Sequence, residues 1–134
     1  MSTSDLSMDE HLLTTPVSRE TLDRLKLGDI VRIDGVIFTG RIGLYTKLFD
    51  ERAEPPVDIA SLTNVTFHCS PAVGEKSPGV WEVSAVTATA SFRFEKHLPM
   101  LMEEHGVRCV IGKGGMSREV YQNHFNRLGA VFLN

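Results

Sequence analysis

The chain has 134 residues, of which 42% are hydrophobic and 23% are charged, and its formal net charge is −3. These values predict one globular domain with a substantial core. An acidic balance without a run of lysine or arginine argues against a nucleic-acid partner. No stretch approaches the roughly 20 apolar residues that cross a bilayer, and the first ten residues lack the apolar run of a secretory signal. We therefore expect no membrane association and a cytoplasmic location.

The N-terminal part is predicted to contain a tail, an extended segment and a short helix. Residues 1–10 are rich in Ser, Asp and Thr, so we expect a disordered tail before a domain that spans residues 11–134. His11–Thr15 precedes a proline, which favours extended backbone. Ser18 is a typical helix N-cap, and the helix that it begins is expected to end at Gly28-Asp29.

Two further elements are expected before the double proline at positions 55 and 56. Asp29–Thr39 is largely apolar with a turn signal at Asp34-Gly35, which predicts a hairpin or one bent strand. Ile42–Arg52 has helical spacing. Its expected buried stripe consists of Leu44, Leu48 and Phe49.

The middle of the chain is predicted to be mostly strand and loop. Val57–Leu62 is expected to be a connector, and Asn64–Cys69 has the alternation of a strand. Ser70–Gly79 contains two prolines and two glycines, which predicts a surface loop. Trp81–Ala90 favours strand and has many small side chains, which let another backbone or a ligand pack closely.

The last third alternates between helices and strands, and the whole pattern predicts a mixed α/β domain with helices packed on a sheet. Pro99 is expected either to begin or to kink its helix, because proline lacks the N–H that a helix interior requires. The expected elements are a helix over Arg93–Glu104, a buried strand over Val107–Ile111, a helix from Ser117 to about Leu128, and a strand over Ala130–Leu133.

The clearest chemical signal is the glycine turn at residues 112–115. Glycines let backbone N–H groups approach a ligand, and the N-terminus of the following helix favours an anion. Lys113 adds a full positive charge. One interpretation is a carboxylate or phosphate site, and the other is an ordinary strand-to-helix turn with a solvated lysine. A nucleotide loop of the Walker A type is excluded, because no glycine lies five residues before Gly112 and Gly114 follows the lysine.

The cysteines and histidines do not have the spacing of metal ligands. Cys69 and Cys109 lie in apolar runs and are expected to be buried free thiols, which fits a reducing compartment. His68 is expected to lie on the surface or beneath a helix. Three more histidines lie in or beside predicted helices without ligand spacing: His97, His105 and His124. We expect no metal site on this chain.

Five short motifs occur in a fixed order along the chain. They are L-T-T-P (Leu13–Pro16), L-x-x-G-D (Leu25–Asp29), F-T-G-R (Phe38–Arg41), I-G-K-G (Ile111–Gly114) and G-A-V-F (Gly129–Phe132). In this order the sequence resembles the β-subunit or C-terminal domain of the iron–sulfur dependent class I fumarases and L-tartrate dehydratases. The resemblance implies a layered, swivelling β/β/α domain with a mixed sheet. The family's domain continues beyond the last motif, so we expect the family's C-terminal part to be absent here.

The resemblance also implies a function. It points to a hydro-lyase small (β) subunit that hydrates or dehydrates a hydroxy-dicarboxylate related to fumarate, malate or tartrate. The [4Fe-4S] cluster would be supplied by an α subunit in a hetero-oligomer such as α2β2, and would not be bound by this chain. Two alternatives stay open. One is a catalytically silent relative that acts as a regulatory or interaction module, and the other is a free-standing carboxylate-binding domain.

The resemblance assigns candidate site residues. Arg41 matches the arginine of the family's G-R-D-x-x-H stretch and Lys113 the lysine of its I-G-K-G turn, and both are cations that suit a dicarboxylate. We expect Lys113 and Thr87 to be catalytic. The expected substrate-binding residues are Arg41, Lys113, Gly112, Gly114 and Thr89.

Several family positions carry other residues in this chain. Ile42 stands at the acidic position after Arg41, and Tyr45 stands at the histidine position. Placed without a gap on residues 84–90, the family's G-P-T-T-x-x-R pattern has Val86 at its first threonine and Ala90 at its arginine. A shift of one residue moves Thr87 to the first threonine. Both placements remove one cation, which predicts an altered substrate.

Overall fold

The computed structural model describes residues 8–134, so residues 1–7 of the predicted tail lie outside the described residues. Strand β1 (Glu10–Thr14) begins at the last residue of that tail and runs parallel to β2 (Ile30–Asp34). Helix α1 (Arg19–Asp23) connects the two strands. The Ser18 hydroxyl caps this helix as predicted, because it accepts a hydrogen bond from the N–H of Thr21 at 3.2 Å.

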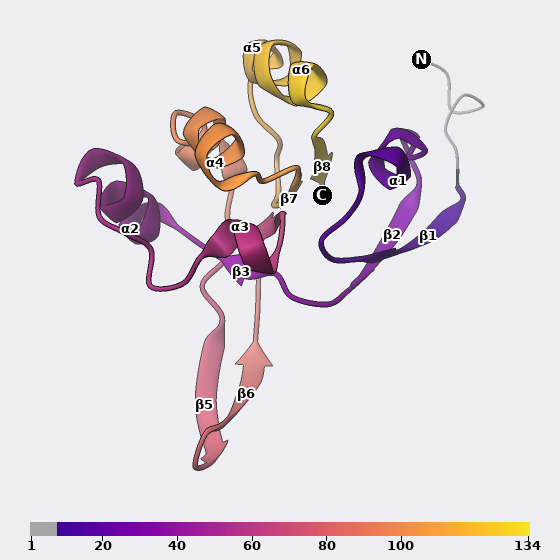
Figure 1. Cartoon of the computed structure of the whole chain (residues 1–134). Helices are drawn as coiled ribbons and strands as arrows, with labels where there is room; N and C mark the ends of the chain where they lie inside the picture. The colour runs from indigo at the N-terminus through magenta and orange to yellow at the C-terminus, as the bar shows by residue number, and fades with distance from the viewer. Residues whose placement is uncertain (1–7) are drawn as a thin grey trace.

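A parallel sheet of four short strands forms the centre of the molecule, in the order β3-β4-β7-β8 (Figure 1). Its strands are β3 (Phe38–Thr39), β4 (Val65–Phe67), β7 (Cys109–Ile111) and β8 (Val131–Leu133). Parallel neighbours require crossover connections, and each connection here contains at least one helix.

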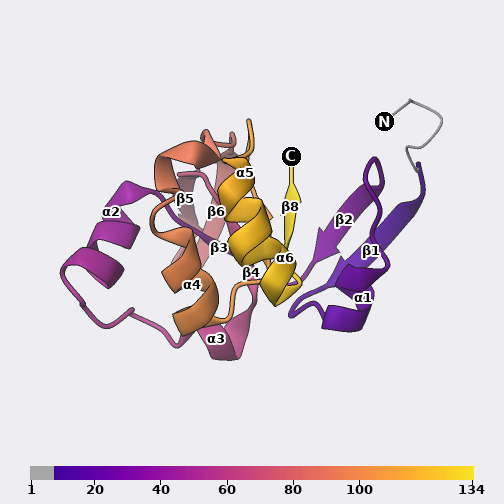
Figure 2. The same ribbon diagram turned by 90° about the horizontal axis from the view of Figure 1, so that it is seen from above.

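The helices of these connections cover one face of the sheet, and the β1–β2 pair lies on the other side (Figure 2). Two of the helices are composite, because a change of helical pitch divides each into labelled parts. The helical segments are α2 (Ile42–Tyr45) with η2 (Thr46–Asp50), α3 (Ile59–Leu62), η3 (Ser91–Phe94), α4 (Leu98–His105), and α5 (Arg118–Val120) with η4 (Tyr121–Phe125) and α6 (Asn126–Leu128).

The layers follow from the alternation of side chains along each strand, since successive residues point to opposite faces. Within β7, Val110 packs in the core beneath the helices, whereas Cys109 packs in a second core shared with β1, α1 and β4. The first core is centred on Tyr45, Phe94, Leu98, Leu101 and Met102, and the second on Leu13, Val17, Leu22 and Val65. This arrangement confirms the predicted layered α/β fold.

Several predicted boundaries are confirmed. Leu48 and Phe49 are buried on the predicted helix. Pro99 lies in the first turn of α4, so it begins that helix and does not kink it. Gly106 ends α4 in the left-handed region at φ +70°. The Ser117 hydroxyl caps the last helix.

The hairpin predicted at Asp34-Gly35 is wrong, and so is the single bent strand, because β2 and β3 belong to different sheets. Gly35 has φ +113°, and a Cβ at this position would lie 2.3 Å from Oγ1 of Thr15. Glycine therefore lets the chain pass closely beside Thr15 as it crosses from one sheet to the other.

Three other predictions need correction. The predicted loop over Ser70–Gly79 contains a strand, because β5 (Ala72–Ser77) and β6 (Val80–Ala85) form an antiparallel hairpin that projects from the body of the molecule (Figure 1). The segment Val57–Leu62, which was predicted to be a connector, contains helix α3. Helix α1 ends at Asp23 and not at Gly28, because the intervening residues form turns.

Candidate functional site

The carboxyl ends of the four parallel strands meet at one edge of the central sheet, which we call the carboxyl edge. Arg41 follows β3, His68 follows β4, and Gly112 and Lys113 follow β7. The structure therefore brings the two predicted cations, Arg41 and Lys113, to the same edge. Since β4 lies between β3 and β7, the two strands that these residues follow are about 10 Å apart, or two strand spacings.

Both cations are available to a ligand. Arg41 and Lys113 are exposed. Within residues 8–134, neither side chain forms an ion pair or a hydrogen bond with another residue. Two unpaired cations on one sheet edge can bind the two carboxylates of a small dicarboxylate.

The glycine turn has a specific steric cause. Gly112 is buried, and its N–H donates a hydrogen bond to the carbonyl of Leu133 at 2.9 Å. A Cβ on residue 112 would lie 1.8 Å from Oγ of Ser91, so the position requires glycine. Gly114 adopts the left-handed region at φ +76° and turns the chain towards the last helix.

The N-terminus of the last helix is occupied by a side chain of the protein itself. The N–H of Ser117 donates a hydrogen bond to Oε1 of Glu95 at 2.5 Å. Hydrogen bonding from Ser117 lowers the pKa of Glu95, so this carboxylate stays ionised at neutral pH. The anion site predicted here must therefore depend on Lys113 and its turn, and not on the helix N-terminus.

Residues 86–91, which we call the crossing segment, pass over the carboxyl edge. Ala88 bridges to Cys69, and Ala90 bridges to Lys113. The N–H of Thr89 donates to the carbonyl of His68 at 2.6 Å. The structure thus brings Thr89 beside the glycine turn at residues 112–115, which we call the Lys113 turn. Thr87 is exposed and lies before the first bridge.

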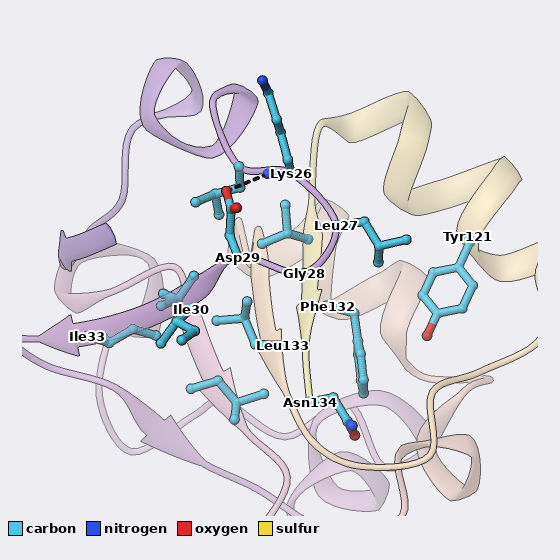
Figure 3. Close-up of a pocket in the computed structure, with 14 residues that line it drawn as sticks. Lys26, Leu27, Gly28, Asp29, Ile30, Ile33, Tyr121, Phe132, Leu133 and Asn134 are labelled. Carbon is cyan, nitrogen blue, oxygen red and sulfur yellow. Dashed lines mark hydrogen bonds between the residues drawn. The ribbon is translucent and has the colours of Figure 1, made fainter. Parts of the chain in front are cut away.

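A separate groove of about 940 Å³ lies between β2 and β8 (Figure 3). Its walls are mainly apolar and include Leu27, Ile30 and Leu133. Asp29 at its rim accepts a hydrogen bond from the N–H of Lys26 at 2.9 Å. None of the predicted site residues lines this groove, so its apolar surface is distinct from the cationic carboxyl edge.

The described residues offer no ligand set for a metal cluster. Within residues 8–134, no group of three or more His, Cys, Asp or Glu side chains could hold a metal ion. Both cysteines are free and buried, and burial raises the pKa of the Cys109 thiol to about 12. Residues 8–134 therefore do not supply such a ligand set.

No helix within residues 8–134 is both long enough and apolar enough to cross a membrane.

Comparison with known proteins identifies the family. Residues 2–134 match the family described as Fumarase C-terminus. The chain belongs to this family. The match covers nearly the whole sequence and confirms the resemblance that the five motifs indicated.

Individual relatives of the fumarase C-terminal family are longer than this chain. The chain is 36% identical to a protein of Geobacillus stearothermophilus assigned as a class I fumarate hydratase, over 96% of this chain and 26% of the relative. It is 33% identical to the L(+)-tartrate dehydratase subunit beta of Escherichia coli, over 78% of this chain and 51% of the relative. It therefore spans about a quarter and about half of the length of these two proteins.

The sequence analysis did not consider a third placement of the family pattern, which brings in Arg93. The family pattern G-P-T-T-x-x-R also fits three residues later than the first placement, and Thr89 then stands at its first threonine and Arg93 at its arginine. The structure keeps Thr89 at the carboxyl edge and leaves Arg93 exposed in η3. The four-residue spacing from Thr89 to Arg93 was the available signal.

Tyr45 is a core residue in this member of the family. It is fully buried, with its ring edge against Phe94 at a centroid distance of 5.4 Å. Burial raises the pKa of its hydroxyl above the usual value. Because this side chain is buried, it does not reach a ligand in the position where the family's histidine would stand.

Proposed function

We propose that this chain is the small subunit of a hydro-lyase that adds water to, or removes it from, a small hydroxy-dicarboxylate. The observation that carries the proposal is the pair of exposed cations, Arg41 and Lys113, which have no ion-pair partner within residues 8–134 and lie on one edge of a fumarase C-terminal domain. The named relatives are hydratases or dehydratases of dicarboxylates. In this proposal the two cations bind the carboxylates and Gly114 lets the backbone approach them, whereas the N–H of Gly112 already donates to the carbonyl of Leu133.

The proposed proton-transfer group is the hydroxyl of a threonine in the crossing segment, before the bridge that Ala90 forms with Lys113. Thr87 and Thr89 are the two candidates, and the bridge between Ala90 and Lys113 favours Thr89. The [4Fe-4S] cluster would come from a partner α subunit, where it would supply a Lewis acid for the substrate. The free buried thiols suit the proposed cytoplasmic location.

The decisive experiment is co-expression with a cluster-bearing α-type subunit. We expect a brown complex that interconverts a hydroxy-dicarboxylate and its dehydrated product, and a colourless, inactive chain when it is expressed alone. A stable complex without turnover on a panel of hydroxy acids would support the second candidate, a silent carboxylate-binding module. The core position of Tyr45, where the family has histidine, is the observation that favours this second candidate.

Arg93 provides a test of the motif placement. In the active complex, we expect Arg93→Ala to raise the KM for the dicarboxylate about tenfold, because one charge-assisted contact contributes about 1.5–3 kcal/mol. Arg32→Ala, on the separate β1–β2 pair, is the matched control and should leave KM unchanged. Equal KM values for wild type and Arg93→Ala would reject the placement that includes Arg93.

We further propose that the partner subunit contacts the β5–β6 hairpin. Val73 lies opposite Val83, and on the same face Trp81 lies opposite Glu75, so this face carries three apolar side chains and one carboxylate. The three apolar side chains are 52%, 60% and 65% exposed. The hairpin leaves and rejoins the body at the carboxyl edge, so a subunit that brings a cluster to Lys113 would meet it.

The hairpin face makes a specific prediction. We expect Trp81→Ala to weaken the affinity of this chain for its partner subunit at least tenfold, because exposed tryptophans are frequent binding hot spots. The melting temperature of the isolated chain should not change, since the side chain lies outside both cores. Glu82→Gln on the opposite face is the control, and isothermal titration calorimetry would measure both. Unchanged affinity of the Trp81 variant would place the interface elsewhere.

A further inference from the structure

A buried polar pair lies directly beneath the carboxyl edge. Nδ1 of His68 and Oγ of Ser91 are 2.8 Å apart, and both side chains are fully buried. The imidazole packs edge-on against the ring of Phe94 at a centroid distance of 4.9 Å. Its Nε2 atom has no hydrogen-bond partner within residues 8–134. The bond to Ser91 is therefore the polar contact that holds this ring.

The pair lies where three backbone segments meet. The N–H of His68 donates to the carbonyl of Ile111 at the end of β7 at 2.8 Å, and the carbonyl of His68 accepts from Thr89. The N–H of Ser91 donates to the carbonyl of Lys113 at 3.1 Å. The end of β4, the crossing segment and the Lys113 turn are thus connected through these two residues.

The steric environment fixes the geometry of the pair. The position that a Cβ would take on Gly112 is 1.8 Å from Oγ of Ser91 and 3.3 Å from Nδ1 of His68. The hydroxyl of Ser91 therefore fills the space that the glycine leaves open. Because burial lowers the pKa of His68 to about 4, the imidazole is neutral at physiological pH and the hydrogen bond needs no counter-ion.

We propose that His68 and Ser91 are positioning residues, whose side-chain hydrogen bond holds Thr89 of the crossing segment in register with the Lys113 turn. Neither residue touches the substrate. The pair sets the position of the threonine hydroxyl relative to the lysine cation, and a shift of about 1 Å in such a geometry can cost a large factor in rate. This inference rests on the proposed function for its catalytic consequence, but its structural part does not.

The test uses Ser91→Ala, which removes only the hydroxyl. In the isolated full chain we expect amide hydrogen exchange at Thr89 and Ser91 to become at least tenfold faster, while the amides of the β1–β2 pair, such as Ile30, are unaffected. In the complex with the α subunit, we expect kcat to fall about tenfold with little change in KM. His68→Asn, which keeps a hydrogen-bonding group near the position of Nδ1, should restore part of both effects relative to His68→Leu.

The possible outcomes separate this inference from the proposed function. Unchanged exchange at Thr89, or an equal increase across the whole chain, would overturn the positioning role. Faster local exchange together with a complex that has no hydro-lyase activity before mutation would support the positioning role and reject the proposed function. If Ser91→Ala does not fold, the comparison of His68→Asn with His68→Leu by the same exchange measurement decides the question.

Discussion

Replacing Lys113 by alanine in the assembled enzyme is expected to lower kcat/KM for the dicarboxylate about 10- to 100-fold, because a charge-assisted hydrogen bond contributes about 1.5–3 kcal/mol and each 1.4 kcal/mol is a factor of ten. The expected loss is this large because Lys113 is exposed and, within residues 8–134, has no carboxylate partner. Its charge is therefore available to the substrate. Steady-state kinetics over a range of substrate concentrations would divide the loss between kcat and KM.

Two variants control this experiment. Lys113→Arg retains the cation and should recover part of the activity, although a guanidinium does not have the shape of an ammonium. Lys47→Ala removes an exposed lysine of η2 that is paired with Glu51 and lies six residues after Arg41, and should leave the kinetics unchanged. Wild-type activity in Lys113→Ala would contradict the carboxylate site and would favour the interpretation of an ordinary strand-to-helix turn.

The second large effect is expected on stability. We predict that Gly112→Ala lowers the free energy of unfolding by about 2–4 kcal/mol, since overpacking and a broken buried hydrogen bond each cost about 1–3 kcal/mol. The new Cβ would displace Oγ of Ser91, and the buried His68 would lose its hydrogen-bond partner. Urea denaturation followed by circular dichroism would measure the change.

The matched control is Gly43→Ala in α2, where a Cβ would meet nothing within 4 Å. This change should be neutral or stabilise the chain by up to about 1 kcal/mol, because alanine favours helix over glycine. A double-mutant cycle adds a sharper test. Gly112→Ala should cost less in a Ser91→Ala background, since the clashing hydroxyl is absent. Equal costs in both backgrounds would show that the clash with Ser91 is not the cause.

The sequence predicted those parts of the fold that depend on local patterns. Helix caps at Ser18 and Ser117, the proline that begins α4 and the strand before Gly112 all follow from residues close together in the chain. The error at Asp34-Gly35 has a different origin. A turn signal is the same whether the next strand returns to its neighbour or enters another sheet, and the difference depends on distant residues such as Thr15, which Gly35 passes closely.

The candidate site was predictable only in part, for the same reason. Strand ends can be located from sequence, so Arg41 and Lys113 could be identified as cations that follow strands. The order β3-β4-β7-β8, which places them two strands apart, depends on pairing between distant segments. The role of Ser91 was not visible, because its significance comes from a buried contact with His68, which is 23 residues away.

The open edge of β8 has a practical consequence for every experiment on the isolated chain. β8 is the last strand of the central sheet in the described part of the chain, and its three residues are all apolar. Edge strands of this kind can pair with other chains, and natural proteins often protect them with charges or prolines. We therefore expect concentrated samples to self-associate along β8, and Asn134→Lys, at the exposed residue that follows the strand, to act as a flanking gatekeeper against it.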